Sequence, residues 1–133
     1  MPAITGIHHL SLTVRDLGVS EEFYSKVFGF VRVLELDDVE GRGTKCVLAH
    51  PDSGTIVGFT AHKANDGSAF SPFRTGLDHL SFGVATRADL DAWANTLDEL
   101  GIAHSDIRST GIGDLLTLND PDEVQIELWA SPA

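Results

Sequence analysis

Histidine and acidic side chains make up nearly all of the residues in this sequence of the types that bind metal ions. The 133 residues include six His, 20 Asp or Glu and a single cysteine, Cys46. One cysteine cannot form an internal disulfide or a cysteine-cluster metal site. A metal ion bound by this chain would therefore take its ligands from imidazole nitrogens and carboxylate oxygens.

A repeat singles out two of the six histidines. Residues 6–14 read GIHHLSLTV and residues 76–84 read GLDHLSFGV, so His9 and His79 occupy equivalent positions 70 residues apart. Self-similarity at a fixed offset is the sequence signature of a repeated structural unit. The pattern predicts a duplicated unit of about 60 residues.

The same offset recurs at a second place, where Pro51-Asp52 matches Pro121-Asp122. Two separated agreements favour a duplication over a chance match. A length of 133 residues suits one domain built from two such modules. The expected ranges are 1–133 for the domain, about 4–62 for module one, 63–75 for the linker and about 76–131 for module two.

Each half shows the same order of expected elements. Alternating apolar residues predict a first strand, a helical apolar stripe follows, and turn signals separate three further strands. Ser20 is expected to cap the first helix and Gly29 to end it, while Thr86 or Asp89 caps the second and Gly101 ends it. The later strands are expected at 30–38, 43–50 and 55–62 in the first half, and at 102–108, 113–119 and 123–130 in the second. Each half therefore reads βαβββ, which predicts an α+β fold.

Three polar residues stand on strands that are otherwise well patterned. Side chains alternate between the two faces of a strand. If the apolar residues of each strand pack on the helices, then His9, His79 and Glu127 lie on the opposite face. The same parity places His8 on the helix side.

The sequence resembles the vicinal oxygen chelate superfamily, which includes glyoxalase I, extradiol dioxygenases, methylmalonyl-CoA epimerase, fosfomycin-resistance enzymes and bleomycin-binding proteins. The resemblance covers nearly the whole chain. It rests on HHLSLTVRDL at 8–17, FYSKVFGF at 23–30, GLDHLSFGV at 76–84 and NDPDEVQIEL at 119–128. It implies two tandem βαβββ modules that form a curved mixed sheet around a metal-binding cavity, with the helices outside.

The resemblance also implies a ligand set. In the family, metal ligands come from the first strand of each module and from the last strand of the second, and His9, His79 and Glu127 match these positions. Two neutral imidazoles and one carboxylate leave open positions on an octahedral ion. Such a site suits Fe(II) or Mn(II), with Zn, Ni and Co as alternatives, and a substrate that chelates the metal through adjacent oxygens.

One family ligand has no counterpart here. Glyoxalase I and the epimerases use a fourth ligand, whose position corresponds to Val57 or Gly58, and neither residue can bind a metal. This departure favours dioxygenase-type chemistry over glyoxalase-type isomerisation or lyase chemistry. Against a standard dioxygenase, Thr117 replaces a signature tyrosine, and Glu123 replaces the usual glycine after Asp-Pro-Asp.

His62 is the expected catalytic residue. It lies 17 residues before His79 and resembles, in placement, the acid–base histidine of extradiol dioxygenases. A histidine with a pKa near about 6.5 can take and return a proton at neutral pH. Ser11, Thr117 and Trp129 are expected to contact the substrate, although Trp129 would also suit a hydrophobic rim or a dimer contact.

The net charge of −11 argues against nucleic acid or an anionic membrane as a partner. With one cysteine and no membrane-spanning or signal-like apolar run, we expect a cytoplasmic protein. The charge also suits an alternative function, a metal-free protein that sequesters a cationic antibiotic as bleomycin-resistance proteins do. In both cases we expect a small-molecule ligand and a homodimer, with the site either within one chain or shared across subunits.

Overall fold

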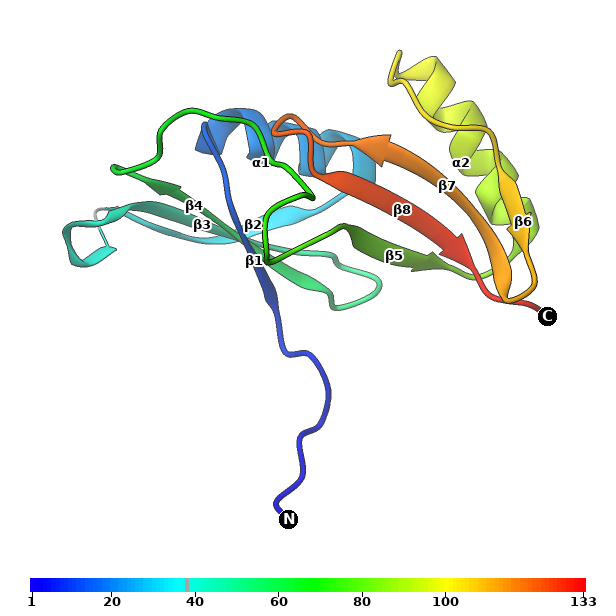
Figure 1. Ribbon diagram of the computed structural model, residues 1–133, viewed down its shortest axis with the longest axis horizontal. Helices are drawn as coiled ribbons and strands as arrows, with labels where there is room; N and C mark the ends of the chain where they lie inside the picture. The colour runs from blue at the N-terminus through cyan, green and yellow to red at the C-terminus, as the bar shows by residue number, and fades with distance from the viewer. Residues whose placement is uncertain (38) are drawn as a thin grey trace. The chain divides into compact units, whose positions relative to one another are not determined.

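The computed structural model describes residues 1–37 and 39–133 and divides into two compact units, Met1–Ser68 and Ala69–Ala133. Each unit contains a four-stranded mixed sheet with a helix packed on one face (Figure 1). The prediction of an α+β fold with two βαβββ modules is confirmed. Asp38, the last residue of the strand expected over 30–38, lies outside the described residues.

The first unit follows the predicted order of elements. They are β1 (Leu10–Thr13), α1 (Leu17–Phe28), β2 (Val31–Leu36), a short 3-10 helix (Val39–Gly41), β3 (Gly43–Ala49) and β4 (Ile56–His62). The strands lie in the order β1-β4-β3-β2, in which β1 runs parallel to β4 and the other pairs are antiparallel. The parallel pair brings the first and last strands of the module side by side.

The second unit repeats this topology. Its elements are β5 (Leu80–Val84), α2 (Arg87–Glu99), β6 (Arg108–Thr110), β7 (Gly113–Asn119) and β8 (Gln125–Ala130). The strands lie in the order β5-β8-β7-β6, again with the first and last strands parallel. Residues near the start of β5 are therefore held beside β8.

Each sheet buries one face against its own helix. Burying apolar side chains in this way is the main stabilising contribution to such a layer. In the first unit the fully buried side chains include Tyr24 of α1 and Leu48 and Phe59 of the sheet. In the second unit they include Leu90 and Leu97 of α2 and, from the sheet, Leu116, Ile126 and Leu128. The opposite face of each sheet carries the polar residues singled out in the sequence.

The helices begin where side chains cap them. The prediction of Ser20 as the first N-cap is wrong: Asp16 is the cap, its carboxylate accepts the Val19 N–H at 3.0 Å, and Ser20 is buried inside the helix. An early aspartate can satisfy the free N–H groups of a helix start as well as serine can. Thr86 caps α2 in a reciprocal pair with Asp89.

The strand expected over 102–108 is also wrong. The described strand β6 covers only Arg108–Thr110, and the preceding residues form coil with an isolated bridge from His104 to Leu118. Ser105 explains the difference, because its N–H donates to the Thr117 carbonyl and its hydroxyl accepts the Thr117 N–H, both at 2.9 Å. A side chain has thus taken the place of a regular strand ladder.

A polar cluster lies on the helix side of the first sheet. Arg32 of β2 pairs with Glu21 of α1 at 2.6 Å and with Glu35 at 2.7 Å. The thiol of Cys46, which is fully buried, donates to the same Glu21 carboxylate at 3.7 Å. Burial, followed by the negative charge of Glu21, raises the pKa of the Cys46 thiol.

Among the described residues, no helix is both long enough and apolar enough to cross a bilayer.

Candidate metal site

The second unit brings two of the predicted metal ligands together. His79 lies one residue before β5, and Glu127 lies on β8 opposite Ser81 in the parallel pairing. His79 Nε2 is 3.5 Å from Glu127 Oε2. The Glu127 side chain is 14% exposed and that of His79 38% exposed, so a small ligand could reach the pair.

The donor atoms of this pair suit a divalent metal ion. Two atoms that each bind one ion at about 2.1 Å lie roughly 3 to 4 Å apart. The separation of 3.5 Å between His79 Nε2 and Glu127 Oε2 is compatible with that geometry. One imidazole nitrogen and one carboxylate oxygen also form a chemically suitable donor pair for Fe(II), Mn(II) or Zn(II).

The other ring nitrogen of His79 is already engaged. His79 Nδ1 lies 2.7 Å from Asp78 Oδ1. This hydrogen bond is the main reason that the pKa of His79 is raised, and the negative charges of Glu127 and Asp78 act in the same direction. Partial burial of the ring opposes them. Asp78 was not among the residues predicted for the site, although it stands directly before a repeated histidine in the sequence.

His9, the third predicted ligand, lies in the first unit, one residue before β1. Its Nδ1 is 2.9 Å from the Nδ1 of His8, and the two rings meet edge to face. The prediction that His8 faces the helix is wrong, because His8 is exposed and its ring turns toward His9. Within each described unit, no cluster of three His, Cys, Asp or Glu side chains could hold a metal by itself.

The strand pairing identifies the residue that corresponds to Glu127 in the first unit. Ser11 pairs with Gly58, just as Ser81 pairs with Glu127. Gly58 is therefore the counterpart, and Val57 lies on the buried helix side. A Cβ atom at Gly58 would lie 3.0 Å from Ser11 Oγ and 3.5 Å from Lys45 Cε. The first unit thus has no ligand side chain at this position.

The remaining predicted residues lie on both units. Ser11 is exposed on β1 and His62 is exposed at the end of β4, opposite Gly43. In the second unit Thr117 is half-buried and pairs directly with Glu127. Trp129, also half-buried, lies two residues beyond Glu127 on β8 and therefore on the same face.

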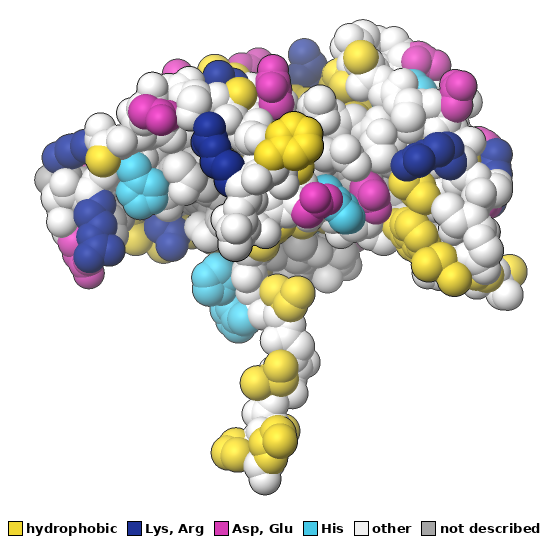
Figure 2. All heavy atoms as spheres, viewed as in Figure 1, with side chains coloured by type: hydrophobic (Ala, Val, Ile, Leu, Met, Phe, Trp, Pro, Cys, Tyr) yellow, Lys and Arg dark blue, Asp and Glu magenta, His cyan; other side chains and the backbone are white. Residues whose placement is uncertain are grey.

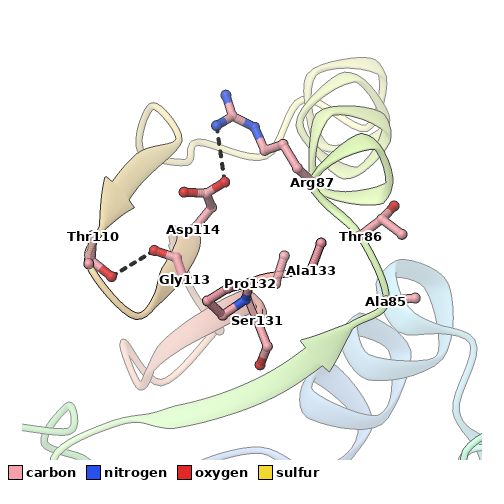
Figure 3. A pocket seen from close by; sticks show the side chains of 11 residues that line it. Ala85, Thr86, Arg87, Thr110, Gly113, Asp114, Ser131, Pro132 and Ala133 are labelled. Atoms are coloured by element: carbon pink, nitrogen blue, oxygen red, sulfur yellow. Dashed lines mark hydrogen bonds and ion pairs between the residues drawn. The ribbon is translucent and has the colours of Figure 1, made fainter.

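Two cavities lie elsewhere in the second unit. One, of about 310 Å³, lies between the start of α2 and the β6–β7 turn, where Arg87 reaches Asp114 at 3.3 Å (Figure 3). The other, of about 360 Å³, is lined by Thr117 and the coil around His104. Neither is lined by His79 or Glu127.

Charged side chains of both signs alternate over the face shown in Figure 2, where acidic groups stand beside Lys and Arg. Several are paired, as Arg87 is with Asp91 and Asp114. The net charge of −11 is therefore not gathered into one acidic patch on this face.

Comparison with known proteins assigns the family. A model described as the Glyoxalase/Bleomycin resistance protein/Dioxygenase superfamily matches residues 6–128. The chain belongs to this superfamily. The resemblance seen in the sequence is thereby confirmed. Among functionally curated proteins, no sequence matches significantly.

Solved structures of superfamily members share the fold. A glyoxylase/bleomycin resistance protein/dioxygenase domain from Frankia sp. EAN1pec is 27% identical, with a TM-score of 0.88 over 98% of this chain and 100% of that one. A glyoxalase family protein from Enterococcus faecalis is 23% identical, with a TM-score of 0.76 over 94% and 97%. The fosfomycin resistance protein FosX from Listeria monocytogenes, in a complex with Mn(II) and a dihydroxypropylphosphonic acid, is 18% identical, with a TM-score of 0.73 over 98% and 93%.

Proposed function

We propose that this superfamily member is a divalent-metal-dependent enzyme that acts on a small substrate with two adjacent oxygens. The observation that carries the proposal is the approach of His79 Nε2 to Glu127 Oε2 at 3.5 Å, with the other nitrogen of His79 held by Asp78. His9 would supply the third ligand. The Mn(II) in the FosX complex supports a divalent ion, and we favour Fe(II) or Mn(II) over Zn, Ni or Co.

The absence of a side chain at Gly58 indicates the type of chemistry. His9, His79 and Glu127 would hold the metal, which would supply Lewis-acid chemistry to a chelating substrate. Without a carboxylate at Gly58, the first unit provides no base there to move a carbon-bound proton. We therefore favour dioxygenase-type chemistry over glyoxalase-type isomerisation.

The chain's own residues would bind the substrate and move protons. His62 is proposed as the proton carrier, because a histidine changes charge near neutral pH. Ser11, Thr117 and Trp129 are proposed to contact the substrate; Thr117 faces Glu127 across the β7–β8 pair. We also propose a homodimer and, because the single cysteine is a free thiol, a reducing cytoplasmic location.

Metal stoichiometry tests the proposal directly. The purified protein is loaded anaerobically with Fe(II) or Mn(II), freed of excess ion and assayed for metal content. We expect about one ion per chain, and marked loss of metal in His9→Ala, His79→Ala and Glu127→Ala. Glu99→Gln, which removes an exposed carboxylate at the end of α2, is the matched control and should retain the metal. Substoichiometric metal in the loaded wild type would overturn the proposal.

The net charge of −11 favours one alternative function, the metal-free sequestration of a cationic ligand. Calorimetric titration with a cationic glycopeptide, with and without a chelator, separates the two. Tight binding that a chelator does not weaken would support sequestration. Binding that is absent, or that requires metal, would support the enzyme.

A further inference from the structure

We infer that Asp78 is a positioning residue, which holds the His79 ring so that Nε2 is presented toward Glu127. This role of Asp78 rests on the proposed function, because orienting the His79 ring serves a purpose only if His79 binds a metal. It depends on the geometry of one hydrogen bond and on a comparison between the two modules. Asp78 contacts Nδ1 of the ring, whereas Glu127 lies near Nε2, so the two carboxylates meet different nitrogens of His79.

A hydrogen bond links Asp78 to the His79 ring. Asp78 Oδ1 lies 2.7 Å from His79 Nδ1. An ionised carboxylate can only accept hydrogen bonds, so Nδ1 must carry the hydrogen. A neutral imidazole has one protonated nitrogen, and its other nitrogen therefore has a free lone pair. With Nδ1 protonated, the free lone pair of His79 is on Nε2, 3.5 Å from Glu127 Oε2.

The hydrogen bond to Asp78 decides which nitrogen of His79 is available to bind a metal. Which ring nitrogen of a histidine binds a metal is set by the hydrogen bond that the other makes. A carboxylate partner also makes the imidazole a stronger donor and fixes the plane of the ring. Since the Asp78 side chain is 76% exposed, its hydrogen bond is not needed to satisfy a buried group. A role in orienting His79 accounts for it better than a role in the core.

The first module has a different residue beside its repeated histidine. His8 stands where Asp78 stands in the repeat, and His8 Nδ1 lies 2.9 Å from His9 Nδ1. A neutral histidine can donate or accept at that nitrogen. His8 therefore orients the His9 ring without fixing its tautomer, whereas Asp78 permits only one. The two histidine ligands are accordingly unequal, and His79 is the more strictly defined.

The tautomer of His79 can be measured in the metal-free protein. Long-range nitrogen–proton NMR of histidine-labelled protein, in alkaline buffer where the ring is neutral, distinguishes protonated Nδ1 from protonated Nε2. We expect His79 to be protonated at Nδ1 in the wild type, whereas in Asp78→Asn, whose amide can accept or donate at Nδ1, the tautomer should no longer be fixed. In Asp78→Ala the ring should populate both tautomers. Asp52→Ala, an exposed aspartate in the turn before β4, is the matched control and should leave the His79 signals unchanged.

A second readout is the affinity for Mn(II), measured by calorimetry. Loss of a carboxylate that orients a metal-ligating histidine typically weakens binding by about 10- to 100-fold. We expect a loss of that size in Asp78→Ala, a smaller loss in Asp78→Asn and no change in Asp52→Ala.

The two readouts separate the inference from the proposed function. Wild-type His79 protonated at Nε2, or a tautomer that Asp78→Ala leaves unchanged, would overturn the inference even if Mn(II) binds. Mn(II) binding equally tight in Asp78→Ala and wild type would also overturn it. Wild type that binds neither Mn(II) nor Fe(II), yet shows the expected tautomer and its loss in Asp78→Ala, would overturn the proposed function and support the positioning of His79 by Asp78.

Discussion

In the first module Ser11 lies opposite Gly58, whereas in the second Ser81 lies opposite Glu127. The backbones around these pairs are alike, with parallel strands in the same register and the same strand order in each sheet. The difference teaches that a duplicated frame can be kept while one position changes its chemistry. The second module places a carboxylate beside its histidine, whereas the first has glycine at the equivalent position.

The turns before the last strands show where the two copies differ in length. The N–H of His50 donates to Thr55 in one turn, and the N–H of Asp120 donates to Val124 in the other. The first turn thus has one residue more, which explains why Gly58 and not Val57 matches Glu127. A change of length in a turn leaves the strand register intact, whereas a one-residue slip within a strand would reverse its faces.

The largest expected loss of stability comes from substitution at a pair of equivalent glycines. Gly43 has φ 151° and Gly113 has φ 150°, and a Cβ at Gly113 would lie 2.7 Å from the Ala130 carbonyl oxygen. Backbone strain of about 1–3 kcal/mol and overpacking of about 1–3 kcal/mol add at such a site. We expect Gly43→Ala and Gly113→Ala each to lower the free energy of unfolding by about 2–6 kcal/mol in urea titrations. If one variant alone is destabilised, the two modules do not share this constraint.

A second substitution makes module two resemble module one. We expect Glu127→Gly to weaken Mn(II) binding by at least about 100-fold in calorimetry, because it removes a proposed ligand and not only an orienting group. Gln125→Gly is the matched control, since Gln125 lies on the same strand and face. Each variant loses a side chain from the strand, at a cost of about 0.5–1 kcal/mol in stability. Equal Mn(II) affinity in the two variants would contradict the assignment of Glu127.

A third test substitutes equivalent residues in the turns before the last strand of each module. Glu123 has φ 68° and its counterpart Gly54 has φ 72°, a region that favours glycine. The left-handed conformation costs a non-glycine residue about 1–2 kcal/mol, partly offset by the chain entropy of glycine. We expect Glu123→Gly to raise the free energy of unfolding by about 0.5–1 kcal/mol, and Gly54→Ala to lower it by about 1 kcal/mol.

Glu123→Ala separates conformation from charge in that test. It removes the carboxylate and keeps the side chain that the left-handed backbone disfavours. Its stability in urea should match that of wild type. An increase as large as that of Glu123→Gly would show that charge, not backbone conformation, sets the effect.

The smallest expected effect concerns the edges of the sheets. In module one, β2 (Val31–Leu36) forms the edge of the sheet. In module two, the residues before β6 are coil, and His104 joins them to the sheet through a bridge to Leu118. The His104 ring donates to the Ser105 carbonyl and contacts Asp98 at 2.8 Å, and these bonds, in that order, raise the pKa of His104. A raised pKa in the folded state stabilises the fold fully below the unfolded pKa of about 6.5. This contribution is lost as pH rises through the folded pKa.

Asp98→Asn should therefore cost stability in acid more than in base. We expect a loss of less than about 1 kcal/mol near pH 6, which shrinks as the pH is raised to about 8.5. Urea unfolding at both pH values measures it. A loss that grows with pH would contradict the sign of the His104 shift.

The sequence allowed the topology to be predicted, because the repeat and the alternation of Leu12 and Val14 with polar residues act through local strand geometry. It did not allow the start of α1 to be placed, since Asp16 and Ser20 are both good caps and tertiary burial of Ser20 decided between them. The coil at Ser105 depends on bonds to Thr117, twelve residues away, which no local pattern reveals.

The candidate site could likewise be predicted only in part from the sequence. The repeat selected His79, and strand parity placed Glu127 on the face away from the helix. The choice between Val57 and Gly58 required the strand register, because one added turn residue was compatible with either. The hydrogen bond from His79 to Asp78 depends on side-chain rotamers, which the sequence pattern does not specify.

The burial of Cys46 has a consequence for a protein proposed to handle Fe(II) and dioxygen. Oxidants attack the thiolate form of cysteine, and attack requires solvent access. Cys46 is the only cysteine in the sequence, and it is fully buried with a raised pKa next to Glu21. The chain therefore carries no readily oxidised thiol.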